Sequence, residues 1–238
     1  MIKDAKILVI LPAYNESGNI GATIRELKAL DFRFDVIVID DGSKDATAQE
    51  ALNAGARVVS LPFNLGIGGA VQTGFLYALR NGYDIAVQVD GDGQHDAQYL
   101  KVILAPVLEE KADITVGSRF IGSDIGWQSS AVRRVGIRFF AWLISGLTGF
   151  SVSDPTSGFR AFNAKAVKIF AEDYPQDFPE PESIMSANRF GLRLLEVPVQ
   201  MRKRAHGHSS IRYFKTLYYM IKVTIAILLN MLKKGVKK

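Results

Sequence analysis

The chain of 238 residues contains no cysteine, and acidic residues are absent from its C-terminal part. Without cysteine there is no disulfide framework, no thiolate nucleophile and no zinc site built on thiolates. From Arg202 onward the chain has ten lysines and arginines and no acid, so residues 1–201 carry a net charge of −5 and the rest carries +10. Nucleic-acid binding usually needs a basic face on the fold itself, so we expect no nucleic-acid partner. A basic tail mixed with apolar residues suits an anionic membrane surface better.

Apolar runs long enough to cross a membrane or to direct secretion are also lacking. The first apolar run, residues 7–12, leads directly into Asn15 and Glu16, as a β-strand does, so we expect an intracellular protein. The uncharged stretch near the C-terminus, residues 223–232, would form about 15 Å of helix, and the hydrocarbon core of a bilayer is about 30 Å thick. The sequence therefore predicts no transmembrane span in this part of the chain.

Strand-like and helix-like stretches alternate along the chain. The apolar strand-like runs are residues 6–11, 35–39, 57–60, 84–89 and 113–117, and the helix-like stretches between them are 17–30, 45–54, 68–81 and 97–110. This alternation predicts an α/β fold with a mostly parallel sheet. Because the strands are apolar throughout, we expect helices on both faces of the sheet. No linker interrupts the pattern, which indicates one large domain.

Polar clusters follow four of the predicted strands, where ligand sites of such sheets lie. They are residues 12–16, 40–43, 64–66 and 90–92. Capping of the following helices explains one such cluster as well as a ligand does. Four clusters along one edge indicate a binding site.

The stretch VDGDGQHD, residues 89–96, places Asp90 and Asp92 one residue apart after an apolar strand. Two carboxylates in this arrangement repel each other unless a cation lies between them. Hard oxygen ligands suit Mg²⁺ or Mn²⁺, which bind one or two carboxylates together with substrate phosphates. Gly91 and Gly93 would let a bulky anion approach the backbone. The pattern predicts a metal–diphosphate site.

The chain resembles a family 2 glycosyltransferase of the GT-A fold, in the branch of dolichol-phosphate mannosyltransferase and bacterial polyprenyl-phosphate glycosyltransferases. The matching motifs are PAYNE at 12–16, DDGSKD at 40–45, NLG at 64–66, DGDGQH at 90–95, GSRF at 117–120, DPTSGFR at 154–160 and EVPV at 196–199. The resemblance implies a Rossmann-like domain over residues 1–210. It also implies that Pro12, Tyr14, Glu16, Asp40 and Asp41 hold the nucleoside of a nucleotide sugar.

The resemblance further implies that Asp90 and Asp92 hold Mg²⁺ or Mn²⁺ on the donor diphosphate. Arg119 and Arg204, with Arg133 or Arg134, would bind the acceptor phosphate or the leaving diphosphate. The implied reaction is an inverting transfer of the sugar to a polyprenyl phosphate at the cytoplasmic face of the cell membrane. Such an acceptor is already an anion and needs no general base.

Two departures from the family pattern favour a hydroxyl acceptor on a lipid-linked saccharide instead. The usual lysine after the arginine motif is replaced by Ser210, with His206 and His208 as uncertain substitutes. Glu180 and Glu182 lie in FPEPES, before a helix expected at residues 183–190, and one of them could act as a general base. Prolines at a helix start are also common for structural reasons.

Two apolar stripes at helical spacing predict amphipathic helices that lie in the membrane surface. One combines Val135, Phe139, Trp142 and Leu143. The other, in a tail at residues 211–238, combines Phe214, Leu217, Tyr218, Ile221, Ile225, Leu228 and Leu232, edged by Lys215, Lys222 and Lys233. The expected protein is peripheral or monotopic.

Other classes fit the sequence less well. Gly66 and Gly68 start a dinucleotide fingerprint, but after the wrong strand and with Val71 in place of its third glycine. A P-loop lysine motif is absent. A non-catalytic nucleotide-sugar sensor remains an alternative, and the sequence leaves the nucleotide, the sugar and a homo-oligomer open.

Overall fold

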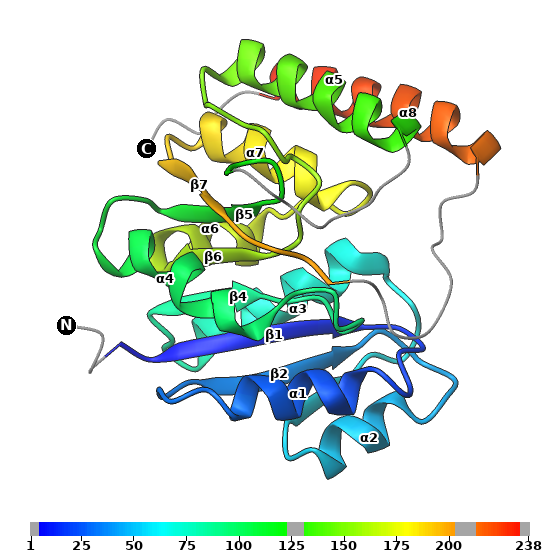
Figure 1. The fold of residues 1–238 in the computed structure, drawn as a ribbon, viewed down its shortest axis with the longest axis vertical. Coiled ribbons are helices and arrows are strands. Elements are labelled where there is room, and N and C mark those ends of the chain that lie inside the picture. Colours follow the sequence, from blue (N-terminus) through cyan, green and yellow to red (C-terminus); the bar gives the residue numbers. More distant parts are fainter. Residues whose placement is uncertain (1–4, 123–130, 203–212, 234–238) are drawn as a thin grey trace.

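The computed structural model describes residues 5–122, 131–202 and 213–233, and these form one seven-stranded sheet flanked by helices (Figure 1). The strands are β1 (Ile7–Ala13), β2 (Asp35–Asp40), β3 (Arg57–Ser60), β4 (Ile85–Gln88), β5 (Ile114–Ser118), β6 (Arg160–Asn163) and β7 (Leu194–Pro198). Their order is β3-β2-β1-β4-β6-β5-β7. Among these strands, only β6 runs antiparallel to its neighbours, β4 and β5. The predicted α/β class with a mostly parallel sheet is confirmed.

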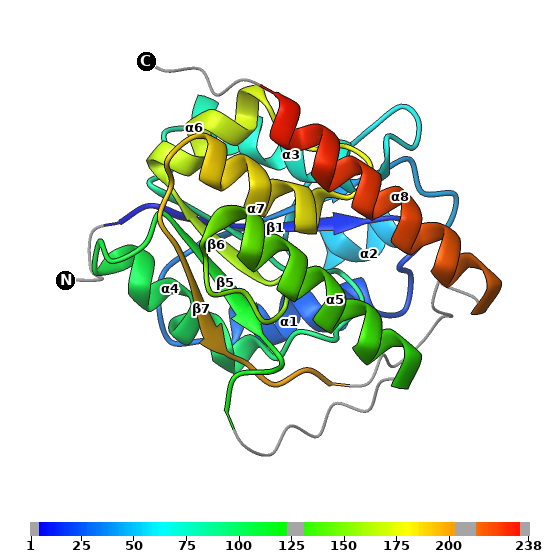
Figure 2. The same ribbon diagram turned by 90° about the horizontal axis from the view of Figure 1, so that it is seen from above.

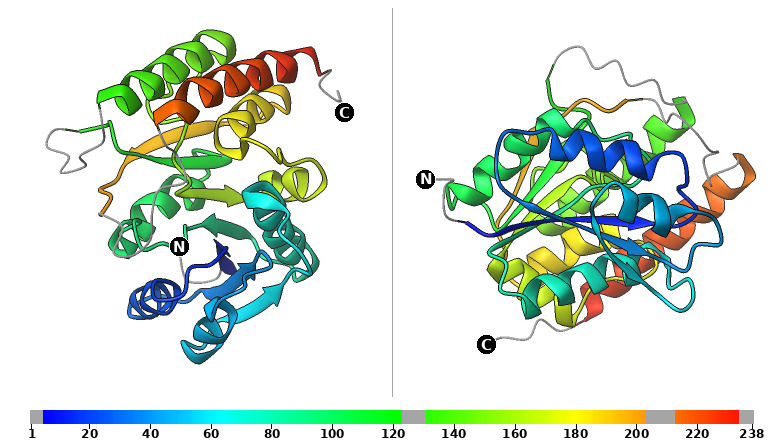
Figure 3. Two further views of the ribbon diagram at one scale, coloured as in Figure 1. Left: turned by 90° about the vertical axis from the view of Figure 1, so that its right-hand side faces the viewer. Right: turned by 90° about the horizontal axis from the view of Figure 1, so that it is seen from below.

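The helices form layers on both faces of the sheet. They are α1 (Ile20–Lys28), α2 (Thr47–Asn53), α3 (Gly66–Arg80), the short 3-10 helix η1 (Ala97–Tyr99), α4 (Leu100–Leu108), α5 (Ala131–Thr148), α6 (Ala164–Glu172), α7 (Pro179–Arg189) and α8 (Tyr213–Leu232). Buried residues of α1, α2 and α4 share one core with the sheet, and those of α3, α6 and α7 share the other. Helices α5 and α8 lie side by side beyond α7, at one end of the molecule (Figure 3).

Strand β1 shows why the strands are apolar throughout. All seven of its residues are buried. Leu8 and Ile10 face the core under α3 and α7, and Val9 and Leu11 face the core under α1 and α4. Since both faces of a covered parallel sheet exclude water, alternation with polar residues is lost.

Two features differ from the predicted elements. Strand β6 has no apolar run of its own, because it begins at the buried Arg160. Helix α7 begins at Pro179 and not at residue 183, so both glutamates of FPEPES lie in its first turn. A proline at this position lacks only an N–H that has no helical partner in any case.

Asp113, just before β5, joins three strands through one buried carboxylate. It accepts hydrogen bonds from the backbone N–H of Arg193 (2.8 Å), from the Arg193 guanidinium (3.1 and 3.2 Å) and from the Asn163 amide (2.8 Å). Burial favours the protonated acid, but these hydrogen bonds outweigh it and lower the pKa of Asp113 to about 2. The charged carboxylate therefore stabilises the fold.

We expect Asp113→Asn to lower the free energy of unfolding at pH 7 by roughly 1–3 kcal/mol, because charge-assisted hydrogen bonds are lost. A lowered folded-state pKa contributes stability above the unfolded pKa, near 3.8, and this contribution is lost as the pH falls through about 2. The difference between variant and wild type should therefore shrink between about pH 4 and pH 2 in urea titrations. Asp31→Asn, at an exposed position, is the control. If the free energies of unfolding of Asp113→Asn and wild type differed by the same amount at every pH, this account would be wrong.

Candidate active site

The predicted site residues gather where the chain reverses its direction of winding through the sheet. From β1 the chain continues to β2 and β3 on one side, and β4 then pairs with the other edge of β1. In open parallel sheets, ligands bind at such a switch point, outside the carboxyl ends of the strands. Asp40 ends β2, and Asp90 follows β4 after one residue. The acidic residues after β2 and after β4 therefore lie on the two sides of β1, at the edge of the sheet where a ligand is expected.

The loops after β1 and β2 are tied together by hydrogen bonds. The N–H of Asn15, which has a left-handed φ of 54°, donates to Ser43 Oγ (2.9 Å), and the N–H of Glu16 donates to Thr47 Oγ1 (2.8 Å). Pro12 is buried within β1, whereas Tyr14 is 45% exposed beside these loops. The structure thus brings the predicted nucleoside residues of both loops together and leaves the Tyr14 ring accessible.

Asp40 and Asp41 are both buried but have different partners. Asp40 Oδ1 accepts the N–H of Ser43 (3.0 Å). Both oxygens of Asp41 accept backbone N–H groups at the start of α3, from Leu65 (2.7 Å) and Gly66 (2.9 Å). Burial raises the pKa of Asp41, and these two hydrogen bonds oppose that shift. Asp41 therefore anchors the loop after β3.

Asp90 and Asp92 present the predicted acid pair. The Asp90 side chain is 37% exposed, and Asp92 is buried, with its Oδ1 accepting the N–H of Gln94 (3.0 Å). Within the described ranges, no group of three or more His, Cys, Asp or Glu side chains forms a metal site. Two hard carboxylates nevertheless fit Mg²⁺ or Mn²⁺, since these ions take their other ligands from phosphate and water.

His95 holds Asp90 in place. Its Nδ1 accepts the N–H of Asp90 (3.0 Å), its Nε2 lies 3.5 Å from Asp90 Oδ2, and its ring stacks on Phe159. Burial lowers the pKa of His95 to about 4, so the ring is neutral at pH 7. His95 belongs to the motif DGDGQH, but the linear pattern does not show that it contacts Asp90.

Gly158 allows the loop before β6 to approach Asp90 closely. A Cβ at this position would lie 2.8 Å from Asp90 Oδ1 and 3.2 Å from Gln88 Nε2. A Cβ atom this close would force the Asp90 carboxylate to move. Glycine at this position therefore allows the carboxylate to keep its place. The motif DPTSGFR contains this glycine, but nothing in the linear pattern shows that it faces Asp90.

We expect Gly158→Ala to reduce metal-dependent turnover about 10-fold or more, because a methyl group would displace one of the two proposed metal ligands. The measurement is a Mn²⁺ titration of donor hydrolysis, in which the half-saturating concentration should rise. Gly146→Ala in α5 is the matched control, since its Cβ would meet nothing within 4 Å. The same half-saturating Mn²⁺ concentration for both variants would show that Gly158 does not support a metal ligand.

Arg119, predicted to bind phosphate, lies buried against the loop after residue 153. Its guanidinium donates twice to Asp154 (2.5 and 2.6 Å) and once to Thr156 (2.7 Å). Asp154 is held in turn by Glu196, which accepts its backbone N–H (2.9 Å). In this structure Arg119 therefore shapes the loop that carries Gly158, and phosphate binding by Arg119 stays a prediction. Arg134 is exposed on α5, whereas Arg204, His206, His208 and the side chain of Arg133 lie outside the described residues.

Glu180 and Glu182 face different surroundings. Burial raises the pKa of Glu182, and this shift is opposed by the N–H of Phe178 and by Asn230 and Lys233 of the α8 region. Burial also raises the pKa of Glu180, with the charge of Arg160 lowering it and the charge of Asp90 raising it. The pKa of Glu180 is therefore influenced by Arg160 and Asp90, and that of Glu182 by the α8 region.

Arg160 is the largest fully buried side chain among the described residues, and sequence reasoning gave it no function. It donates to the carbonyls of Ser157 (2.7 Å) and Pro155 (3.2 Å) and to Ser183 Oγ (2.7 Å). It thereby connects the loop beside Asp90 to the first turns of α7.

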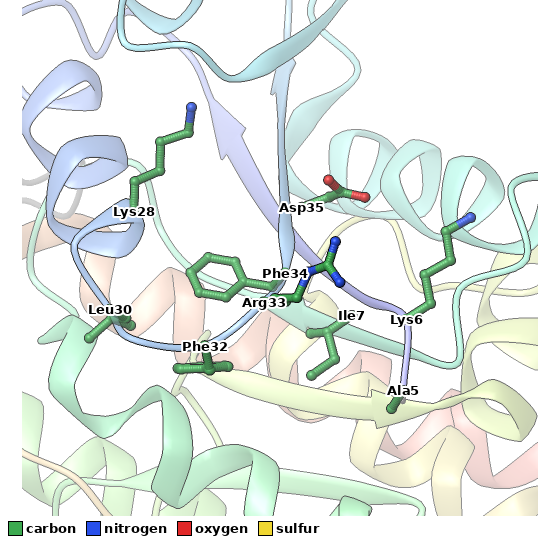
Figure 4. Close-up of a pocket in the computed structure, with 9 residues that line it drawn as sticks. All are labelled: Ala5, Lys6, Ile7, Lys28, Leu30, Phe32, Arg33, Phe34 and Asp35. Atoms are coloured by element: carbon green, nitrogen blue, oxygen red, sulfur yellow. The ribbon is translucent and has the colours of Figure 1, made fainter. Parts of the chain in front are cut away.

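A separate open hollow of about 420 Å³ lies between the start of β1 and the segment that joins α1 to β2 (Figure 4). Lys28, Arg33, Phe32 and Phe34 are among the residues that line it. It lies at the amino ends of these strands, away from the crevice where ligands of such sheets bind. It is therefore not part of the candidate site.

Comparisons with known proteins agree with this geometry. The model of the family described as glycosyl transferase family 2 matches residues 8–170. An uncharacterised protein of Methanocaldococcus jannaschii is 34% identical over 229 residues, which is 92% of this chain and 93% of that protein. Undecaprenyl-phosphate mannosyltransferase of Micrococcus luteus is 29% identical over 220 residues, 87% of each chain.

A solved structure shares the fold. It is glucosyl-3-phosphoglycerate synthase from Mycobacterium tuberculosis, in complex with Mn²⁺, uridine-diphosphate-glucose and phosphoglyceric acid. It is 25% identical, covers 94% of this chain and 79% of its own, and superimposes with a TM-score of 0.72. The fold is thus that of a GT-A enzyme. The chain belongs to glycosyl transferase family 2 and is a glycosyltransferase, not a non-catalytic sensor.

Proposed function

We propose that this glycosyltransferase moves a sugar, with inversion, from a nucleotide sugar to a polyprenyl phosphate at the cytoplasmic membrane surface, with Mg²⁺ or Mn²⁺ as cofactor. The observation that carries the proposal is the acid pair Asp90 and Asp92 at the switch point, beside the buried Asp40. The relative from Micrococcus luteus, named for an undecaprenyl-phosphate acceptor, supports the acceptor class.

The chemistry requires a charged leaving group to depart from the sugar. A divalent ion held by Asp90 and Asp92 would stabilise the charge on the departing diphosphate. His95 and the glycine at 158 fix the position of Asp90, and the joined loops after β1 and β2 present Tyr14, Glu16 and Asp40 to the nucleoside. The residues are held before substrate arrives, so less reorganisation is needed during transfer.

The acceptor decides whether a base is needed. A polyprenyl phosphate attacks as an anion, for which Arg204, with Arg119, remains the proposed partner. A hydroxyl of a lipid-linked saccharide would need a general base. Glu182 is poorly placed for that role because it faces α8, so Glu180 is the candidate base in this second reaction.

A transfer assay tests the proposal. Purified protein with a panel of UDP-, GDP- and dTDP-sugars should glycosylate a short polyprenyl phosphate but not the matching polyprenol. Transfer should stop in EDTA and return with Mn²⁺, and Asp90→Asn should reduce it about 100-fold or more, because one of two hard ligands is lost. Asp31→Asn is the exposed control. Transfer to a saccharide hydroxyl alone would favour the second reaction, and full activity in EDTA would exclude the metal role.

The membrane contact is proposed for the outer faces of α5 and α8. Val135, Phe139 and Trp142 are exposed on α5, and Tyr218, Ile221, Ile225, Leu228 and Leu232 are exposed on α8. Leu143 instead packs against the core, and the side chains of Phe214, Leu217 and Lys215 lie outside the described ones. The opposite face of α8 is anchored, since Val223 and Ile227 are fully buried. In the described part of the chain, no helix is long and apolar enough to cross a bilayer.

Basic side chains accompany this apolar face. Arg134 and Arg138 are exposed on α5, and Lys222 and Lys233 are exposed on or just after α8. Charges of this kind attract anionic lipid headgroups, and the apolar side chains enter the interface between them. The face formed by α5 and α8 therefore supports attachment that is both electrostatic and apolar.

We expect the double variant Trp142→Glu, Ile225→Glu to bind anionic lipid vesicles at least 10-fold more weakly, because two apolar side chains no longer enter the lipid. Sedimentation with vesicles measures the binding, and high salt alone should release the wild type only in part. Leu52→Glu, on the exposed side of α2 at the opposite end of the molecule (Figure 1), is the control. Unchanged sedimentation of the double variant would show that this face is not the attachment surface.

A further inference from the structure

The first turn of α7 reaches the crevice from the sheet face opposite to α1 and α4. Arg160 lies across the β4–β6 ladder from Gln88, at the carboxyl end of β4. From there its guanidinium donates to Ser183 Oγ (2.7 Å), and Ser183 donates to the carbonyl of Glu180 (3.0 Å). Helix α7 begins on the side of the molecule where β1 ends (Figure 2). These contacts tie the backbone of Glu180 through Ser183 to Arg160, which lies across the ladder from Gln88 at the carboxyl end of β4.

Gln88, next to this set of contacts, also indicates a polar ligand. It is fully buried, and both polar atoms of its side-chain amide have no hydrogen-bond partner among the described residues. Its Nε2 and Asp90 Oδ1 both lie close to the Cβ position of Gly158. Buried amides without partners are rare in folded proteins, because each one costs about 1–3 kcal/mol. The floor of the crevice beside Asp90 is thus unusually polar.

The charges near Asp90 limit which part of the donor can lie against Glu180. The diphosphate is an anion and would be repelled by a second carboxylate. The nucleoside belongs to the β1–β2 side of the crevice, near Tyr14 and Asp40. The sugar is attached to the distal phosphate, and its hydroxyl groups are neutral donors that a carboxylate accepts well.

We infer that Glu180 binds hydroxyl groups of the donor sugar and that Arg160 is the positioning residue that holds the first turn of α7 at the crevice through Ser183. The inference rests on the proposed function, and it names the part of the substrate that this corner of the site recognises. Glu180 would then contribute to the choice among sugars, whereas Asp40 and Tyr14 would contribute to the choice among nucleotides. A site built to accept hydroxyl hydrogen bonds discriminates strongly against a sugar that lacks or misplaces them.

Glu180→Gln tests this role, with Glu182→Gln as the matched control two residues away. Binding is measured calorimetrically with Mn²⁺ for UDP-glucose, UDP-N-acetylglucosamine and GDP-mannose, and for UDP and GDP alone. In Glu180→Gln, the Kd of the preferred nucleotide sugar should rise roughly 10-fold, as expected for loss of a hydrogen bond to a charged group. Its preference over the other sugars should shrink, and the Kd of the nucleoside diphosphate should not change. Glu182→Gln should keep all of these constants.

Each other outcome has a distinct meaning. If wild type binds none of these nucleotides, the proposed function fails before the inference is tested. If wild type binds and Glu180→Gln keeps both affinity and sugar preference, the inference is wrong. Loss of turnover with unchanged binding, together with loss of the acidic limb of the pH–rate profile, would instead make Glu180 the base of a hydroxyl transfer. Equal thermal unfolding of both variants excludes a general loss of fold.

Discussion

Repulsion between carboxylates is the constraint on which this site depends. Asp40 lies at the carboxyl end of β2, and Asp90 and Asp92 follow β4, on the other side of β1 at the switch point. Asp40 and Asp92 are buried, which weakens the screening by water. Backbone N–H groups hold Asp40 and Asp92, and His95 holds Asp90. Arg160, buried beneath them, supplies a positive charge without forming a direct ion pair with any described acid. This arrangement holds the acids in place for a cation and a polyanionic ligand.

The sequence predicted the parts of the fold that depend on local patterns. Apolar runs such as residues 6–11 identify strands buried on both faces, and the carboxyl ends of parallel strands meet at one edge. Asp40 and Asp90 could therefore be placed together from the sequence alone. The same logic predicted the position of Tyr14. Apolar runs predicted five of the seven strands, and the family resemblance rested in addition on motifs such as DPTSGFR and EVPV.

The remaining parts depend on contacts that no local pattern records. Strand β6 enters antiparallel between β4 and β5, and this insertion brings Gly158 close to Asp90 and Arg160 opposite Gln88. Arg119 could be recognised as a conspicuous arginine, but its pairing with Asp154 joins residues 35 positions apart. Glu180 and Glu182 looked equivalent in the sequence. Two residues on a helix turn through about 200°, so once α7 includes both, they must face different surroundings.

Because of this rotation, the first turn of α7 contacts the sheet on one side and α8 on the other. One side of its first turn contacts Arg160 of β6 through Ser183, and the other faces α8 through Glu182, which interacts with Asn230. Helix α8 in turn has Val223 and Ile227 buried in the core and Ile221 and Ile225 exposed on its outer face. Under the proposed function, a lipid-linked acceptor that arrived along this outer face would meet the enzyme one helix away from the donor site. The packing that buries α8 would then set the distance between the membrane and the reacting carbon.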